Sequence, residues 1–168
     1  MEDTQSSVTD DLLEHAADYP AVYVEGEHTP RPRRHISVVA CMDARLDLFA
    51  LLGLHPGDCH VLRNAGGIIT EDMVRSLVVS QRALGTREVV LIHHTDCGME
   101  RVVESEFFDA LETETGQRPS WSLGDFDDVE ANVRESIARL RTDPFLPHRD
   151  AIRGFVFDVD TGKLREVV

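Results

Sequence analysis

The apolar residues of this chain fall into short continuous runs that are separated by longer amphipathic segments. The runs over residues 36–40 and 89–93 are rich in valine and isoleucine, which is typical of strands buried on both faces. Residues 60–63 predict a third strand, and residues 154–159 and 164–168 predict two more, joined by a turn. The chain therefore alternates between strand signals and segments long enough to hold a helix.

Helical spacing of apolar residues marks the segments between the strands. The clearest helix begins after Thr70, which is a good N-cap, and ends near Gly85, which favours a left-handed helix stop. Three further helices are predicted over residues 46–54, 99–114 and 128–141. Strands that alternate with helices predict the α/β fold class: a mainly parallel central sheet of about four parallel strands plus a C-terminal edge strand, flanked by helices.

The chain divides into an N-terminal arm, residues 1–35, and a single α/β domain, residues 36–168. In the arm, Asp10 and Asp11 can cap a short amphipathic helix that ends before Pro20, and a proline-rich basic connector follows over residues 28–34. Arm and connector are too polar to pack alone, so we expect the arm to pack on a partner subunit.

The negative charge of the chain argues against nucleic acid as a partner. The net charge is -14, from 31 acidic and 17 basic residues, and an acidic surface of this strength repels nucleic-acid phosphates. Lys163 is the only lysine, which favours a solvated, halophile-like surface suited to high salt over an acidic face that binds a partner. No apolar run approaches a membrane span and the acidic start does not resemble a signal peptide, so we predict a cytoplasmic protein.

Soft metal ligands follow two of the strand runs. Cys41 comes directly after the first run, and His94 and Cys97 follow the run over residues 89–93. Because the carboxyl ends of parallel strands meet at one edge of a sheet, these three side chains can converge on one ion. Two thiolates and one imidazole suit zinc and leave one tetrahedral position over, so we predict one Zn²⁺ per chain and interpret residues 36–168 as a single zinc-binding domain.

The fourth position distinguishes a structural site from a catalytic one. Asp43 and His93 are the nearest further ligands, but Arg45 can hold the Asp43 carboxylate off the metal by a charge-assisted, bidentate bond. A water in the fourth position would then ionise near neutral pH, and Asp43 would accept a hydrogen bond from the hydroxide. His93 points opposite to its strand neighbours and is better explained as a packed histidine than as a ligand.

Other interpretations of the cysteines are open at this point. A cysteine at a strand end is commonly a core residue, and Cys41 with Cys97 could form a redox dithiol, although no C-x-x-C motif is present. Cys59 has no ligand pattern around it and is best interpreted as a buried or half-buried small hydrophobe.

The order and spacing of these motifs resemble those of the β-class carbonic anhydrases. C-M-D-A-R at the first strand end, R-N-A-G-G after the next strand and H-T-D-C-G at the third occur in the family's order. The C-terminal hairpin is similar to that of the short prokaryotic members. The resemblance implies Cys41, His94 and Cys97 as zinc ligands, and Asp43 and Arg45 as a catalytic dyad. It also implies an inactive form in which Asp43 is itself a fourth metal ligand.

The reaction that the resemblance implies is the reversible hydration of carbon dioxide to bicarbonate by a zinc lyase. The family's site lies at a subunit interface, so a homodimer or higher homo-oligomer is expected. His93, His60 and His35 are candidates for proton transfer. Two other functions stay open. One is hydrolysis of carbon disulfide or carbonyl sulfide on the same fold, and the other is a non-catalytic zinc-binding role with Asp43 locked on the metal.

Overall fold

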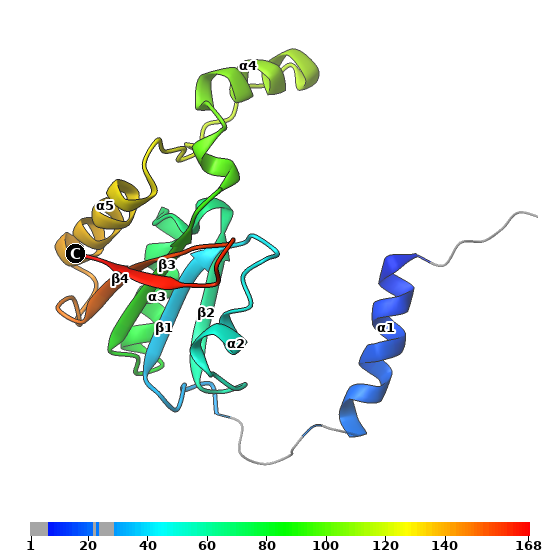
Figure 1. The fold of residues 1–168 in the computed structure, drawn as a ribbon, viewed down its shortest axis with the longest axis vertical. Helices are drawn as coiled ribbons and strands as arrows, with labels where there is room; N and C mark the ends of the chain where they lie inside the picture. The colour runs from blue at the N-terminus through cyan, green and yellow to red at the C-terminus, as the bar shows by residue number, and fades with distance from the viewer. Residues whose placement is uncertain (1–6, 22, 24–28) are drawn as a thin grey trace, which may run out of the picture.

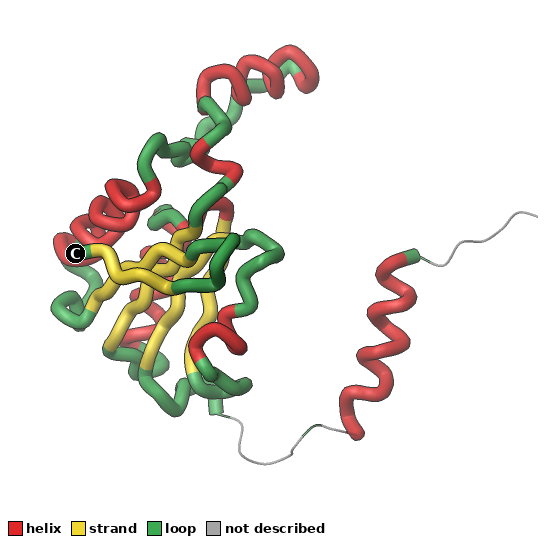
Figure 2. Tube along the Cα trace, viewed as in Figure 1, coloured by secondary structure: helices red, strands yellow, loops and turns green. Residues whose placement is uncertain are grey.

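Five strands form one sheet in the order β2-β1-β3-β4-β5, as seen in the computed structural model, which describes residues 7–21, 23 and 29–168 (Figure 1). The strands are β1 (Ile36–Cys41), β2 (Cys59–Asn64), β3 (Glu88–His94), β4 (Ile152–Phe157) and β5 (Leu164–Val167). The first four are parallel, and β5 runs antiparallel to β4 at the edge. The predicted fold class is confirmed, with helices around a mainly parallel sheet (Figure 2).

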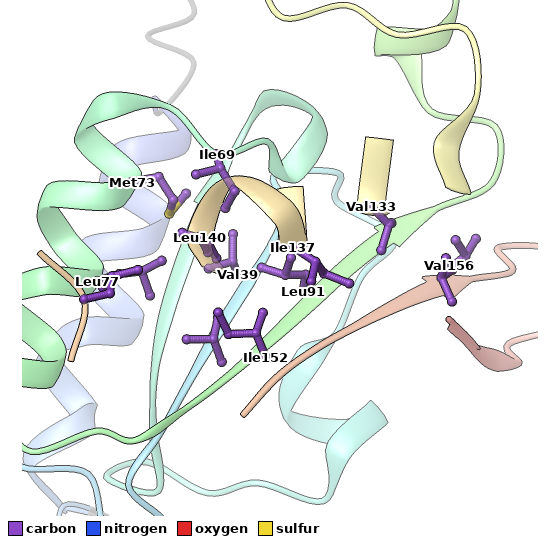
Figure 3. Packing of buried hydrophobic residues seen from close by; sticks show 13 residues of the cluster. Val39, Ile69, Met73, Leu77, Leu91, Val133, Ile137, Leu140, Ile152 and Val156 are labelled. Atoms are coloured by element: carbon purple, nitrogen blue, oxygen red, sulfur yellow. The ribbon is translucent and has the colours of Figure 1, made fainter. Parts of the chain in front are cut away.

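Two amphipathic helices, α3 (Glu71–Arg82) and α5 (Val129–Thr142), cover one face of the sheet. Their buried side chains and those of the strands form one cluster that includes Val39, Leu91, Ile152, Val156, Met73, Leu77, Val133, Ile137 and Leu140 (Figure 3). Gly154 shows how closely α5 approaches β4, because a Cβ atom there would lie 2.3 Å from Val133 Cγ1. The contact between α5 and β4 at Gly154 therefore has no room for an extra methyl group.

The other face of the sheet is covered by a short helix, α2 (Leu48–Leu52), and by loops. Its cluster combines Val38, Ala40 and Ile92 of the central strands with Leu46 and Leu48. The centre of β1 is thus buried on both sides, as its continuous apolar sequence predicted. Because β1 and β3 are fixed between two packed layers, whatever follows their C-terminal ends stands on rigid backbone.

Several predicted boundaries differ from the structure. The segment predicted as one helix over residues 99–114 is a 3-10 helix (Gly98–Glu100) followed by α4 (Glu104–Thr115). The break lets Met99 pack into the second cluster, and Val103 before α4 is extended. β4 begins two residues earlier than predicted, and α3 ends at Arg82, before the Gly85 turn.

The arm holds α1 (Val8–Asp18) and a short 3-10 helix (Tyr19–Ala21). The N-cap of α1 is Ser7. Asp10 takes part in the cap, as predicted, because its carboxylate accepts from the Ser7 backbone N–H in a capping box, whereas Asp11 is not part of that box. Every described residue of α1 is exposed, and the helix stands clear of the sheet (Figure 1). Helices of the described chain are too short and too polar to span a membrane.

Candidate metal centre

Three predicted ligands meet where β1 and β3 end. Cys41 is the last residue of β1 and His94 the last of β3, and the two strands are parallel neighbours. Cys97 returns from the turn that follows β3. The ligand atoms of these three residues lie within 4.8 Å of one another, and all three residues are buried. The three side chains thus converge at one edge of the sheet, as the strand-end argument predicted.

A glycine turn shapes the floor of this centre. Gly67 has φ of +69°, and a Cβ atom on it would lie 2.7 Å from the backbone nitrogen of Cys41. His93 contacts the same turn through Nε2, 3.2 Å from the Gly67 carbonyl oxygen, and burial lowers the pKa of His93 to about 4. The neutral ring thus donates to the turn. Two glycines directly after a strand are a sequence signal of such a close backbone approach.

His94 has one ring nitrogen in a hydrogen bond and one without a partner. Nδ1 lies 2.9 Å from the Thr95 carbonyl oxygen, to which it donates, so Nε2 carries the lone pair. Nε2 is buried and has no hydrogen-bond partner among the described residues. Burial opposes a charge on His94, but the neighbouring Cys41 thiolate and the Thr95 carbonyl raise its pKa overall. A buried, unpartnered nitrogen aimed at two sulfur atoms is the geometry that a metal ligand requires.

The two sulfur atoms differ in their affinity for a proton. Interaction with the Cys97 thiol lowers the pKa of Cys41, while the same interaction together with burial raises the pKa of Cys97. One thiolate is therefore available even before a cation arrives, and a bound dication stabilises the second. A thiolate pair with a neutral imidazole is a donor set that fits zinc.

Asp43 and Arg45 form the predicted bidentate pair beside the three ligands. Arg45 Nε donates to Asp43 Oδ1 at 2.9 Å and Nη2 donates to Oδ2 at 2.8 Å, while the Arg45 backbone N–H also donates to Oδ1. These bonds hold the pKa of the Asp43 carboxyl well below its usual range. Asp43 Oδ2 lies 3.8 Å from His94 Nε2. An ionised carboxylate thus stands next to the centre without belonging to the three-residue cluster.

Two further residues of the centre were missed from the sequence. Arg63 of β2 donates to the carbonyl oxygens of Cys41 (2.8 Å) and Asp43 (2.6 Å), which fixes the loop after β1. Asp96 accepts from Arg45 on the side opposite Asp43, at 3.0 Å from Nη1. An arginine near the C-terminal end of a strand was the available signal for Arg63, whereas nothing in the sequence pairs Asp96 with Arg45.

The other candidate residues lie away from the centre. His60 pairs in register with Ser37 near the start of the strands, and His35 precedes β1, so both stand at the opposite end of the sheet in their own chain. Cys59 opens β2 and is half-buried, as predicted, and burial raises its pKa. Of the three proton-transfer candidates, only His93 lies near the ligands within one chain.

Comparisons with known proteins agree with the site. A family model described as carbonic anhydrase matches residues 36–164. The chain is 49% identical over 161 residues to β-carbonic anhydrase 1 of Mycobacterium tuberculosis, covering 96% of this chain and 98% of that protein. A carbon disulfide hydrolase of Saccharolobus solfataricus is 31% identical, over 96% and 89% of the two chains. The crystal structure of a carbonic anhydrase from Streptococcus mutans superposes with a TM-score of 0.91 at 38% identity, covering 98% of this chain and 100% of that one.

Proposed function

The chain belongs to the β-class carbonic anhydrases, and we propose that Cys41, His94 and Cys97 bind one zinc ion for the reversible hydration of carbon dioxide to bicarbonate. The observation that carries the ligand assignment is His94 Nε2, which is buried and unpartnered among the described residues beside two sulfur atoms. An acceptor buried in this way is costly unless a cation or a donor reaches it. Zinc bound there supplies a Lewis acid that ionises water near neutral pH.

Asp43 and Arg45 supply the orientation that the reaction needs. Both carboxylate oxygens of Asp43 accept from Arg45, so the carboxylate is held beside the centre rather than free to rotate onto it. An ionised Asp43 can accept a hydrogen bond from the attacking oxygen and direct the remaining lone pair at carbon dioxide. The pair also explains how Asp43 can become a fourth ligand: loss of the Arg45 contact frees a carboxylate already near His94.

Hydrolysis of carbon disulfide is the alternative on the same fold. Carbon disulfide hydrolases are among the relatives, but at 31% identity against 49% for β-carbonic anhydrase 1. The solved structures point the same way. The carbonic anhydrase of S. mutans superposes with a TM-score of 0.91, and a carbon disulfide hydrolase with 0.75. Carbon dioxide is therefore the better supported linear substrate.

We propose in addition that the protein works as a homodimer or higher homo-oligomer in which the arm, residues 1–35, packs on a partner subunit and residues 36–168 form the catalytic domain. The apolar residues Val8, Leu12 and Leu13 are between 62% and 76% exposed on a helix that its own domain does not cover. Exposure of such an apolar face to water costs free energy, and a second chain that covers the face would remove this cost. β2 is also an edge strand, paired only with β1 within the described chain.

The acidic composition supports a setting of high salt for a protein that we propose is cytoplasmic. The chain has 31 acidic and 17 basic residues, and because only one of the basic residues is a lysine, arginine is the cation of nearly every ion pair. At high ionic strength the repulsion within such a surface is screened over a few ångströms, so the folded chain keeps both its solubility and its stability.

Stopped-flow measurement of carbon dioxide hydration, combined with metal analysis, tests the proposed function. Cys41→Ser and Cys97→Ser should lose zinc and turnover together, while Cys59→Ser should keep both, because Cys59 lies at the opposite end of the strands. Full zinc retention in both ligand variants would contradict the assignment. A zinc-loaded wild type that hydrolyses carbon disulfide but leaves carbon dioxide untouched would establish the alternative substrate.

A further inference from the structure

The turn that carries Cys97 also binds the side chain of Arg45. We propose that Asp96, itself bound by Arg101, is a positioning residue that fixes Arg45 and thereby sets whether Asp43 stays off the metal. The inference rests on the proposed function of the centre, because it assigns a role to residues behind the Asp43–Arg45 pair.

The Arg45 guanidinium is shared between two carboxylates. Nε and one bond of Nη2 go to Asp43, whereas Nη1 donates to Asp96 Oδ2 at 3.0 Å and Nη2 also donates to the Asp96 carbonyl oxygen at 3.1 Å. All three guanidinium nitrogens are thereby engaged. A planar group bound along two edges cannot rotate without breaking contacts on both sides.

The Asp96 carboxylate is needed because Asp43 lies in the same loop as Arg45. Asp43 and Arg45 are two residues apart in one loop, so their mutual contact does not fix them relative to Cys97 or His94. Asp96 lies in the other ligand-bearing segment, between His94 and Cys97. The chain of contacts from Asp96 through Arg45 to Asp43 therefore ties the loop after β1 to the turn after β3.

The turn is built to present the Asp96 carboxylate. Asp96 has φ of +56°, a left-handed conformation that aspartate tolerates better than most residues. Its second oxygen, Oδ1, accepts from Arg101 at the end of the 3-10 helix. Arg45 and Asp96 are each more than 40% exposed, so the contact adds little to folding stability and its effect should be visible at the metal centre instead.

Two substitutions at position 96 separate side chain from backbone. Asp96→Gly removes the carboxylate and accepts the positive φ without strain, whereas Asp96→Asn keeps a side-chain oxygen for Arg45. Cobalt(II) in place of zinc reports the fourth ligand through its visible absorption. For Asp96→Gly we expect a cobalt spectrum displaced toward that of Arg45→Ala, in which Asp43 is free to bind. We also expect kcat of the zinc enzyme to fall about 1.5-fold to fivefold, the range that corresponds to an exposed charge pair.

Asp96→Asn should restore most of the wild-type spectrum. A double variant provides the second part of the test. In an Asp43→Asn background no carboxylate can move onto the metal, so the addition of Asp96→Gly should leave the cobalt spectrum unchanged. Asp109→Ala is the control, since Asp109 of α4 also pairs with an arginine, Arg118, at 2.6 Å, and its side chain is exposed. It should change neither spectrum nor kcat.

The outcomes separate this inference from the proposed function. An Asp96→Gly protein with wild-type spectrum and kcat overturns the positioning role while leaving the carbonic anhydrase activity in place. A spectral change that persists in the Asp43→Asn background also overturns it, because the change would not then involve Asp43. If zinc-loaded wild type fails to hydrate carbon dioxide, the proposed function is lost, and the cobalt spectra alone decide the role of Asp96.

Discussion

α1 and α3 are amphipathic helices of 11 and 12 residues, yet only α3 is covered by its own chain. α3 buries Met73 and Leu77 against the sheet, whereas α1 buries none of its residues. An amphipathic pattern thus predicts that a helix forms, but it does not say which chain supplies the apolar cover. The difference divides the molecule into a domain whose helices are covered by their own chain, and an arm whose apolar face we propose is covered by a second chain.

A substitution in the centre should abolish function without touching the arm. Gly67→Ala places a methyl group 2.7 Å from the Cys41 nitrogen and also imposes a left-handed conformation on alanine. We expect zinc content to fall and turnover to drop by about a hundredfold or more, since misplaced ligands forfeit several kcal/mol of metal binding and catalysis. Metal analysis and stopped-flow assay measure both effects.

Gly162→Ala is the control for this change. Gly162 has φ of +70°, close to that of Gly67, but nothing lies within 4 Å of its would-be Cβ. It should therefore show only the backbone cost of about 1–2 kcal/mol in stability and keep its zinc. Equal loss of zinc in the two variants would show that strain, rather than contact with β1, governs the turn. If Gly67→Ala also changed the mass of the oligomer in solution, the centre and the arm would not be independent of one another.

The covered and uncovered helices can be compared directly by the same truncation. Leu77→Ala removes a fully buried side chain and should lower the free energy of unfolding by about 2–5 kcal/mol. Leu12→Ala, at a residue 63% exposed, should change the stability of the monomer by less than about 0.5 kcal/mol. Chemical denaturation at low protein concentration measures the contrast.

Leu12→Ala also tests whether a second chain covers the arm. If a second chain covers Leu12, its truncation should weaken association by about tenfold, because one buried leucine loses most of its contact area. Analytical ultracentrifugation over a dilution series would detect this. An unchanged association constant for Leu12→Ala, and for a Val8→Ala, Leu12→Ala double variant, would place the subunit interface elsewhere on the chain.

Sequence reasoning succeeded where a pattern is local and strong. The strand runs, the Thr70 cap and the convergence of Cys41, His94 and Cys97 follow from periodicity and from the rule that parallel strands end at one edge. It failed where contacts join distant segments. The approach of Arg63 to the loop after β1 depends on the side-by-side register of β1 and β2, which no one-dimensional pattern records.

The link between arm and domain should respond to pH. Asp58 accepts from the His55 backbone N–H at 2.9 Å and pairs with Arg33 of the connector, and these contacts lower its pKa. A carboxyl whose pKa is lower in the folded state stabilises that state above its unfolded pKa of about 4, and the benefit is lost as the pH falls toward the folded pKa. Asp58→Asn should therefore melt at a lower temperature than wild type above about pH 5, with the difference narrowing on acidification below about pH 4.

Asp127→Asn serves as the control, because it removes the same charge from an exposed loop position. Its melting temperature should follow that of the wild type through the whole pH range. A difference between Asp58→Asn and wild type that stays constant down to pH 3 would mean that shape, rather than charge, fixes the connector to β2.

The smallest expected effect is that of salt on association, and it distinguishes two ways of covering α1. Each chain carries a net charge of -14, so two copies repel one another, and raising the ionic strength from 0.1 to 1 M shortens the screening length from about 10 to about 3 Å. If apolar contacts hold the arm, salt should strengthen association by a few fold, because repulsion is screened while burial is not. If Asp10, Asp11 or Glu14 instead pair with arginines of the partner, association should weaken. Sedimentation in sodium chloride at both ionic strengths, repeated with Leu12→Ala, decides between them, since only an apolar interface predicts that salt strengthens association and that truncation weakens it.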